Sequence, residues 1–394
     1  MQSFEYYSPT EIIFGKGAEE KTAEKVKKHG GSRVFIVYGG GSVVKSGLLA
    51  RLQNQLEAAG IPYDSIGGVQ PNPLMSLARK GIQQALEFKA DFILAVGGGS
   101  VIDTSKAIAH GIADPEVDIW EYWSGKRPIT KTTPVGVVLT ISAAGSETSN
   151  SAVLTNDEIG KKCGTNTDLN RPRFAIMNPE LTFTLPAWQT ACGITDMMMH
   201  TMERYFSKDD DMETTDAIAE AVLRTCMTEG VKVLVNPTDY TSRANIMWAG
   251  TVAHNDITGC GTTGDWATHC IEHELSGMFD VSHGAGLAAV WGSWARYTRQ
   301  ENLPRFVRFA HNVMGVETAD MDCIEASEAG IKALEAFFQK IGMPTNIHSL
   351  IGRDVTDGEI ETMADKCTNG DTTTVGGLMQ LRKADVMEIY RMAR

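Results

Sequence analysis

The hydrophobic pattern of the chain changes near residue 185. Before that point, short β-branched runs such as RVFIVYGGG and ADFILAVGGGS alternate with amphipathic stretches such as PLMSLARKGIQQALEF. This alternation is typical of βαβ units, and strands that are apolar throughout are typical of a parallel sheet buried on both faces. After it, strand-like runs nearly vanish and stretches such as DAIAEAVLRTCMTEGVKVLV predict helices.

We therefore expect two domains. Residues 1–185 should form an α/β domain with a mostly parallel, Rossmann-like sheet, and residues 186–394 should form an all-α domain. Pro179 and Pro186 flank the segment ELTFTL and make a plausible junction between them. A chain of 394 residues is long enough for two or three domains.

Charge and cysteine content exclude several classes of partner. The net charge of -13 argues against nucleic acid or anionic membrane, because both require a basic surface. Seven cysteines without CxxC spacing fit reduced thiols in the cytoplasm. The chain shows neither a secretory leader nor an apolar run of about 20 residues, the length of a membrane span, so we expect a soluble, unprocessed, cytoplasmic protein.

Histidines and one aspartate in the second half point to a metal site. Asp196 and His200 are four residues apart, as are His269 and His273, and His283 follows in the segment SHG. Side chains four apart on a helix share one face, so each pair can aim at one point. One such pair is more often a solvated helix face, but two pairs with a further histidine predict a divalent metal. Imidazole and carboxylate suit iron(II), zinc, cobalt or nickel rather than calcium, and spacing alone does not exclude His273 as a ligand.

Two glycine clusters sit where predicted strands end. Gly39, Gly40 and Gly41 precede Ser42 after one strand, and the segment 97–100 repeats GGGS after another and leads into a predicted helix. Glycines let backbone amides approach a phosphate closely, and a helix N-terminus favours negative charge. Neither cluster is a GxGxxG or GxxxxGK[ST] motif, and one GGGS alone is more often a tight turn. Two clusters at strand ends predict a nucleotide pyrophosphate site.

If the nucleotide is a nicotinamide dinucleotide, the first cluster also bears on which one is used. Enzymes that use NAD generally place a carboxylate after this strand, where it binds the adenosine ribose and repels a 2′-phosphate. This chain has no acid there, and Ser42 and nearby amides can donate hydrogen bonds. We therefore expect NADP(H) to be favoured over NAD(H), with modest selectivity because no arginine is present.

These motifs together resemble the iron-containing (group III) alcohol dehydrogenases. The resemblance rests on GGGSVIDTSKAIA, on the DxxxH of Asp196 and His200, and on HxxxHxxxxxxxxxHG from His269 to Gly284. TEIIFGKGA near the start and DVMEIY near the end match too, so it covers essentially the whole chain. VYGGGSVVKSG and GDWATH resemble the NADP-dependent butanol dehydrogenase and broad aldehyde reductase branch. The resemblance implies a dehydroquinate synthase-like architecture, in which a dinucleotide-binding domain precedes a metal-binding, catalytic domain.

The resemblance implies a role for each metal-site residue. Asp196, His200, His269 and His283 would be the ligands of iron(II), or of zinc. His273 would be a non-ligand that passes a proton to solvent.

The resemblance also implies cofactor contacts. The pyrophosphate would be held by Gly98, Gly99 and Ser100, the nicotinamide and ribose by Thr140, Ser149 and Lys162, and the adenosine end by Asn72. The family often reads TTAGTGSE where this chain reads TISAAGSE, so Ala144 replaces a threonine hydroxyl. One cofactor contact of the family should therefore be missing.

The expected reaction interconverts primary alcohols and aldehydes. The metal would polarise the aldehyde oxygen while hydride arrives from C4 of NADPH. His273 would relay a proton, since an imidazole ordinarily titrates near pH ~6.5. We expect small to medium, largely apolar, butanol-like substrates, because no cationic residue marks the site for a charged one. Pairing of edge strands predicts a homodimer.

Other interpretations are open from the sequence. A glycerol-type polyol dehydrogenase fits the same motifs. A dehydroquinate synthase-like lyase would need a basic pocket, yet few Lys or Arg residues cluster near the ligand motifs. A nucleotide-binding or metal-storage protein without catalysis is a third. His254, in AHND, is most simply a satisfied helix histidine, although it could face a cleft.

Overall fold

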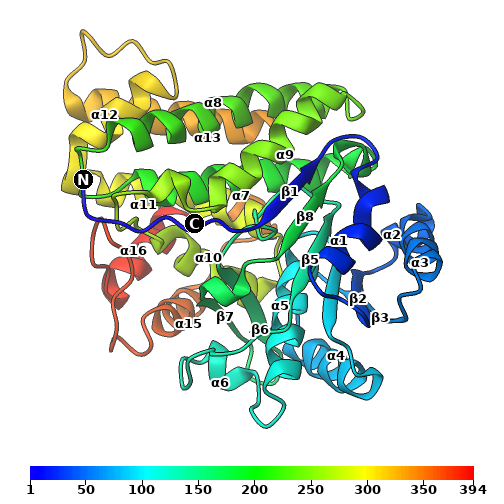
Figure 1. The fold of residues 1–394 in the computed structure, drawn as a ribbon. Helices are drawn as coiled ribbons and strands as arrows, with labels where there is room; N and C mark the ends of the chain where they lie inside the picture. The colour runs from blue at the N-terminus through cyan, green and yellow to red at the C-terminus, as the bar shows by residue number, and fades with distance from the viewer. The chain divides into compact units, whose positions relative to one another are not determined.

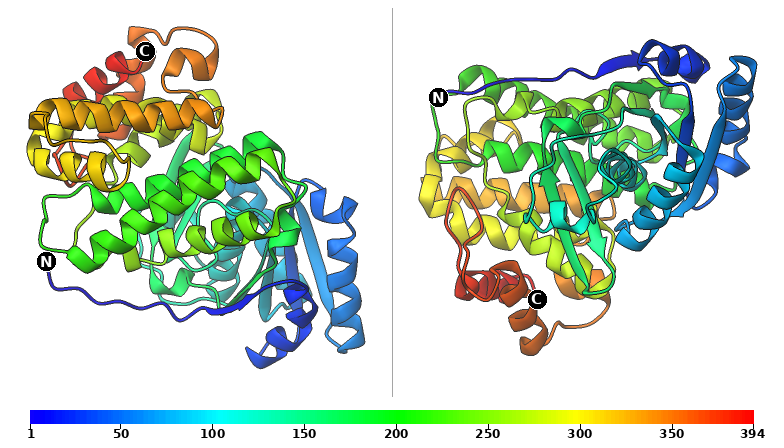
Figure 2. Two further views of the ribbon diagram at one scale, coloured as in Figure 1. Left: turned by 90° about the horizontal axis from the view of Figure 1, so that it is seen from above. Right: turned by 60° about the horizontal axis from the view of Figure 1, so that its bottom comes forward.

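The computed structural model describes residues 1–394, which divide into two compact units. One unit is Tyr7–Leu185, and the other is Pro186–Arg394 together with Met1–Tyr6. The first six residues therefore pack with the helical unit, although the pattern change at residue 185 assigns them to the α/β domain. Their backbone is extended, as the dark blue segment in Figure 2 shows. None of the helices is both long and apolar enough to cross a bilayer.

A six-stranded parallel sheet forms the centre of the α/β unit, which confirms the predicted fold class (Figure 1). The strand order is β1-β8-β5-β4-β2-β3. Strand β4 therefore lies between β2 and β5. The strands are β1 (Glu11–Phe14), β2 (Val34–Gly39), β3 (Tyr63–Val69), β4 (Phe92–Gly97), β5 (Val135–Leu139) and β8 (Phe174–Met177).

Both faces of this sheet are buried, as the continuous apolar runs predict. Val34 and Ile36 pack into one apolar cluster with helix residues such as Leu52, while the alternate residues Phe35 and Val37 are buried on the opposite face. The helices and 3-10 turns of this unit are η1 (Ala18–Lys21), α1 (Thr22–Lys28), α2 (Ser42–Lys45), α3 (Leu48–Ala58), α4 (Met75–Phe88), α5 (Gly99–Ala113), α6 (Trp120–Trp123), η2 (Asp168–Asn170) and η3 (Pro179–Thr182).

A separate antiparallel hairpin follows β5. Its strands are β6 (Ser151–Asn156) and β7 (Lys161–Asn166). Every second residue of β6 is buried, which is the pattern of a strand that packs one of its faces against a hydrophobic core.

The second unit is helical, as predicted. Its core contains the fully buried methionines Met197, Met198 and Met199 and a cluster of aromatic rings that includes Phe206 and Trp291. The elements are α7 (Ala187–Tyr205), α8 (Glu213–Val235), α9 (Tyr240–His254), η4 (Ile257–Gly259), α10 (Ala267–Phe279), α11 (His283–Thr298), η5 (Arg299–Asn302), α12 (Leu303–Asn312), α13 (Cys323–Lys340), α14 (Ile347–Ile351), α15 (Asp357–Cys367) and α16 (Lys383–Met392).

Candidate metal centre and nucleotide-binding edge

Helix α7 carries Asp196 and His200 on successive turns of one face, inside the helical core. Both side chains are buried, each residue with 6% of its surface exposed. A carboxylate and an imidazole buried among apolar residues are costly unless they are paired or bind a cation. Helix α10 adds His269, and α11 begins with His283.

One oxygen of Asp196 faces nitrogen atoms of three imidazoles. Its Oδ1 lies 3.7 Å from His200 Nδ1, 3.8 Å from His269 Nε2 and 3.7 Å from His283 Nε2. These distances are too long for hydrogen bonds, and the first three of these four atoms are buried without any hydrogen-bond partner. Four ligands at about 2.1 Å around a tetrahedral metal would lie roughly 3.4 Å apart. The spacing therefore fits a divalent metal among them.

The electrostatics of this cluster favour a cation. Burial alone would raise the pKa of Asp196, but the surrounding imidazoles of His200, His269 and His283 hold that pKa well below its usual range. Burial alone would lower the pKa of His269, yet Asp196 and Glu203 together raise it to about 9. Positive charge at His269 Nε2 is thus stabilised by two carboxylates, as a bound metal would be.

Two buried glutamates orient the histidines from behind. Glu203 Oε1 accepts hydrogen bonds from His269 Nδ1 at 2.8 Å and from the His269 backbone N–H at 2.9 Å. Glu272 bonds His283 Nδ1 and the hydroxyl of Ser276. Carboxylates behind ligating histidines fix the ring orientation and increase the basicity of the ligand nitrogen. Neither glutamate was predicted from the sequence, although Glu203 continues the helical face of Asp196 and His200.

His273 lies beside the centre and outside the group around Asp196. Ligand atoms of Asp196, His200 and His269 all lie within 4.8 Å of one another, and a second such group contains Glu272, His273 and His283. The His273 ring centroid is 6.4 Å from that of His269 and 5.6 Å from that of His283. The side chain is partly exposed, so it can exchange protons with solvent.

Both glycine clusters lie at the same edge of the parallel sheet. The first ends β2 at Gly39 and leads through Gly40 to Ser42, and the second ends β4 and leads into α5. Thr140 follows β5, and its N–H donates to the Gly97 carbonyl at 3.0 Å. Because β2, β4 and β5 are neighbours, their carboxyl ends bring these segments together.

The start of α5 has the features of a phosphate site. Gly98 is the N-cap residue, and no side chain caps this end of the helix. The backbone N–H groups of Gly99 and Ser100 therefore donate no hydrogen bond to a capping side chain and are available to a phosphate. A Cβ at Gly98 would lie 2.9 Å from the Ile141 side chain, and one at Gly99 would lie 3.2 Å from Ala144. The glycines thus permit close packing beneath the helix start.

The other predicted cofactor residues fall into two places. Lys162 on β7 donates to Asn72 Oδ1 at 3.1 Å, and Asn72 adopts a left-handed φ of 53° in the loop after β3. Ser149 is buried, and its hydroxyl bonds the backbone of Ser151. The structure thus joins Asn72 to Lys162, while Ser149 is engaged within its own loop.

A buried lysine that was not predicted as a site residue secures this loop. Lys106 on α5 is 1% exposed and donates to the carbonyls of Ser146 and Ser151 at 2.8 and 2.7 Å. Asp103 accepts from the Ser146 hydroxyl at 2.6 Å and from the Val153 N–H at 2.9 Å. The motif DTSK directly after the second glycine cluster, with an acid and a lysine three residues apart, was the available signal.

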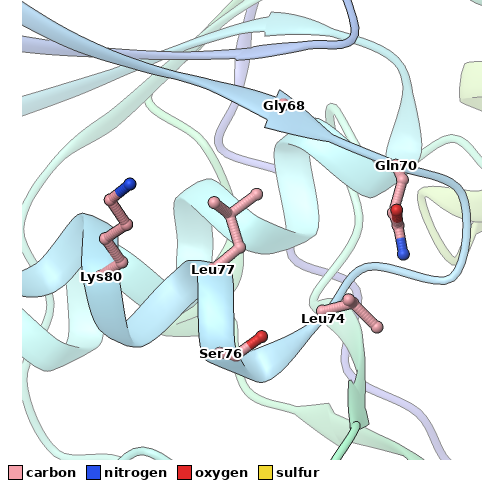
Figure 3. Close-up of a pocket in the computed structure, with 6 residues that line it drawn as sticks. All are labelled: Gly68, Gln70, Leu74, Ser76, Leu77 and Lys80. Atoms are coloured by element: carbon pink, nitrogen blue, oxygen red, sulfur yellow. The ribbon is translucent and has the colours of Figure 1, made fainter.

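A surface cavity of about 350 Å³ lies next to the segment that carries Asn72. Figure 3 shows its lining, which comes from β3, from α4 and from the loop between them: Gly68, Gln70, Leu74, Ser76, Leu77 and Lys80.

Comparison with known proteins agrees with this arrangement. The chain matches the family described as iron-containing alcohol dehydrogenase over residues 9–179, and the C-terminal part of the Fe-containing alcohol dehydrogenase family over residues 190–394. It is 39% identical over 393 residues to NADH-dependent butanol dehydrogenase A of Clostridium acetobutylicum, covering 99% of each chain. It is 37% identical over 349 residues to the NADPH-dependent aldehyde reductase YqhD of Escherichia coli, covering 88% of this chain and 89% of that one.

A solved structure shares the fold. The NADH-dependent butanol dehydrogenase A from Thermotoga maritima matches with a TM-score of 0.95 and 36% sequence identity, over 100% of this chain and 99% of that one.

Proposed function

The chain belongs to the iron-containing alcohol dehydrogenase family, and from this membership we propose that it interconverts butanol-like primary alcohols and their aldehydes with a nicotinamide cofactor. The observation that carries the proposal is the single Asp196 oxygen that faces three imidazole nitrogens at 3.7–3.8 Å. Such a site suits a Lewis-acidic metal, and the glycine-bearing edge of the α/β sheet suits a dinucleotide.

We assign the metal to Asp196, His200, His269 and His283, with iron(II) or zinc as the ion. When bound, the metal would polarise the carbonyl oxygen of the aldehyde and stabilise negative charge on it. The chain itself keeps the ligand rings in place, because Glu203 holds His269 and Glu272 holds His283.

We assign the cofactor to the edge formed by β2, β4 and β5. The amides of Gly98, Gly99 and Ser100 would hold the pyrophosphate, and Thr140 lies on the neighbouring strand end. Asn72, in the loop after β3, and Lys162, on β7, are joined by a hydrogen bond and would both contact the cofactor. Ser149 can contribute through its backbone, since its hydroxyl is engaged.

We propose that NADP(H) is preferred to NAD(H), with modest selectivity. No carboxylate lies between Gly39 and Ser42, and no atom lies within 4 Å of where a Cβ would project from Gly40. An adenosine 2′-phosphate would therefore meet open space and the Ser42 hydroxyl instead of a negative charge.

We propose that His273 moves the proton. It lies one helical turn from His269 and is partly exposed, so it can pass a proton between the reacting oxygen and solvent. In the reductive direction the alkoxide formed by hydride transfer would gain its proton by this route.

The proposal is tested by removing the metal and refilling the protein with iron(II) or zinc. Oxidation of NADPH and of NADH with butyraldehyde is then followed by absorbance. We expect activity to return with one of the metals and kcat/KM to be higher with NADPH. No oxidation with either metal and either nucleotide, or turnover of glycerol in place of butanol, would contradict the proposal.

A variant that lacks one proposed ligand is compared with a control variant that lacks an exposed histidine. His269→Ala should lose metal and at least about 100-fold of the activity, more than typically follows loss of an outer partner of a ligand. His311→Ala removes an exposed histidine on α12 and should change neither. Full activity of His269→Ala without bound metal would refute the site.

A further inference from the structure

The proposed ligand His200 is held in place by different contacts from those that hold His269 and His283. Glu203 and Glu272 hold His269 and His283 by hydrogen bonds. The imidazole of His200 makes no such bond, and its Nδ1 is buried without a hydrogen-bond partner. Something other than a carboxylate must therefore set the plane of the His200 ring.

A fourth imidazole lies flat against that ring. The centroid of the His254 ring is 3.9 Å from the His200 centroid, with an angle of 16° between the ring planes. The His269 ring continues the stack at 4.8 Å and 16°. His254 is the last residue of α9 and is only 7% exposed, so the stack is enclosed by protein.

Arg204 clamps His254 in this position. Its Nη2 lies 3.0 Å from His254 Nδ1 and 3.1 Å from Asp256 Oδ1. Its Nη1 donates to the carbonyls of His200 at 2.9 Å and Ala253 at 3.2 Å. One guanidinium thus ties the turn of α7 that carries His200 to the end of α9.

The clamp also fixes the form of the His254 ring. An arginine always donates, so Nδ1 must accept and the hydrogen of the ring lies on Nε2. The guanidinium is itself held over the Trp266 ring at 4.8 Å.

We propose that His254 is a positioning residue of the metal centre. By stacking, it sets the ring plane of His200, as Glu203 and Glu272 set those of His269 and His283 by hydrogen bonding. This inference rests on the proposed set of metal ligands, and it assigns a role to a histidine that the sequence alone treats as a satisfied helix residue.

The test uses metal-stripped protein loaded with cobalt(II), whose visible absorption reports ligand geometry. The rate of cobalt release to a chelator is measured with the spectrum, and the thermal unfolding of the metal-free protein serves as a check on folding. We expect His254→Leu to alter the spectrum and to speed release at least about tenfold, the lower end for loss of an outer partner of a ligand.

Two further variants separate stacking from general packing. His254→Phe keeps a flat ring without the bond to Arg204, and it should restore most of the wild-type spectrum and release rate. Ile246→Ala creates a cavity on the same helix α9, and it should lower the unfolding temperature without changing either property.

The outcomes distinguish this inference from the proposed metal site. If the wild-type protein binds no cobalt, both fail. If it binds cobalt and His254→Leu keeps the wild-type spectrum and release rate, only the role of His254 fails. Equal losses in His254→Leu and His254→Phe would overturn stacking as the cause.

Discussion

At the scale of single residues, Asp196 decides the character of the metal centre. Its carboxylate is almost fully buried on a helix whose other faces carry Met197, Met198 and Met199. Water cannot solvate the charge there, and no N–H or O–H donates to Oδ1. The negative charge is therefore available to a cation, and the histidines around it are the other proposed ligands.

His273→Ala tests the proton relay. Loss of a general acid or base typically lowers turnover about 10²–10⁴-fold, so kcat should fall and its pH profile should change. Metal content should stay at the wild-type level, because His273 is not one of the three imidazoles that face Asp196 Oδ1. Kinetics across pH and metal analysis check both points, with the exposed His311→Ala as control. Unchanged turnover would contradict the relay, and loss of metal would make His273 a ligand.

The metal-site residues could be predicted from spacing only in part. The four-residue intervals and the resemblance pointed to Asp196, His200 and His269, which the structure brings together. Glu203 meets His269 across 66 residues and Arg204 meets His254 across 50, and no local pattern specifies such contacts. They depend on how α7, α9 and α10 pack.

At the scale of elements, the junction of β4 and α5 consists of glycines: β4 ends at Gly97, and α5 begins after the N-cap Gly98. Gly98→Ala should disturb it, because the added Cβ would lie 2.9 Å from Ile141 Cβ. We expect the KM for the nucleotide to rise roughly tenfold, a loss of about 1.4 kcal/mol in binding. Steady-state kinetics check this against Gly358→Ala, where the new Cβ meets open space. An unchanged KM would argue against a phosphate site there.

Lys106 should make stability depend on pH. Burial lowers the pKa of its amine from the usual 10.5 to about 8. Between these values the unfolded chain keeps a proton that the folded protein has lost, so stability from this group rises with pH. Relative to Lys106→Met, the wild type should gain roughly 1–3 kcal/mol between pH 7.5 and 10 in urea unfolding. The exposed Lys80→Met is the control, and a difference independent of pH would contradict the prediction.

Elements with strong periodicity were predictable, whereas the hairpin β6–β7 was not recognised. The strands of the parallel sheet are apolar at almost every position, which marks them in the sequence. In β7 the residues KKCGTN include no large apolar side chain and none is fully buried. Pairing with β6 forms this strand, and such a long-range effect is weakly encoded in local composition.

At the scale of the whole molecule, each unit holds one of the two proposed ligand sites. All four proposed metal ligands belong to Pro186–Arg394, and all proposed cofactor residues belong to Tyr7–Leu185. The boundary predicted from the pattern change separates them at residue 185, but it could not reveal that Met1–Tyr6 pack with the second unit. Those residues contact Gly261 and Asp209, far along the chain.

Metal and cofactor should therefore stabilise different parts of the protein. A metal at about 1,000 times its Kd adds about 4.1 kcal/mol to the stability of the folded state that binds it. In calorimetry, we expect chelation of the metal to lower the unfolding transition of the helical unit, and NADP to raise that of the α/β unit. Calcium, which prefers all-oxygen sites, serves as the control. If chelation left the unfolding profile unchanged, the buried metal centre would be contradicted.

The placement of Met1–Tyr6 has a consequence for biosynthesis. These residues are synthesised well before the partner of Gln2, because Gln2 bonds Asp209, which is 207 positions later. At about 5–20 residues per second, roughly 10–40 s pass before that partner is made. The α/β unit lies wholly between these two positions in the chain, so it can fold before Asp209 is made, and the contacts of Gln2 form only after the first helices of the second unit have emerged.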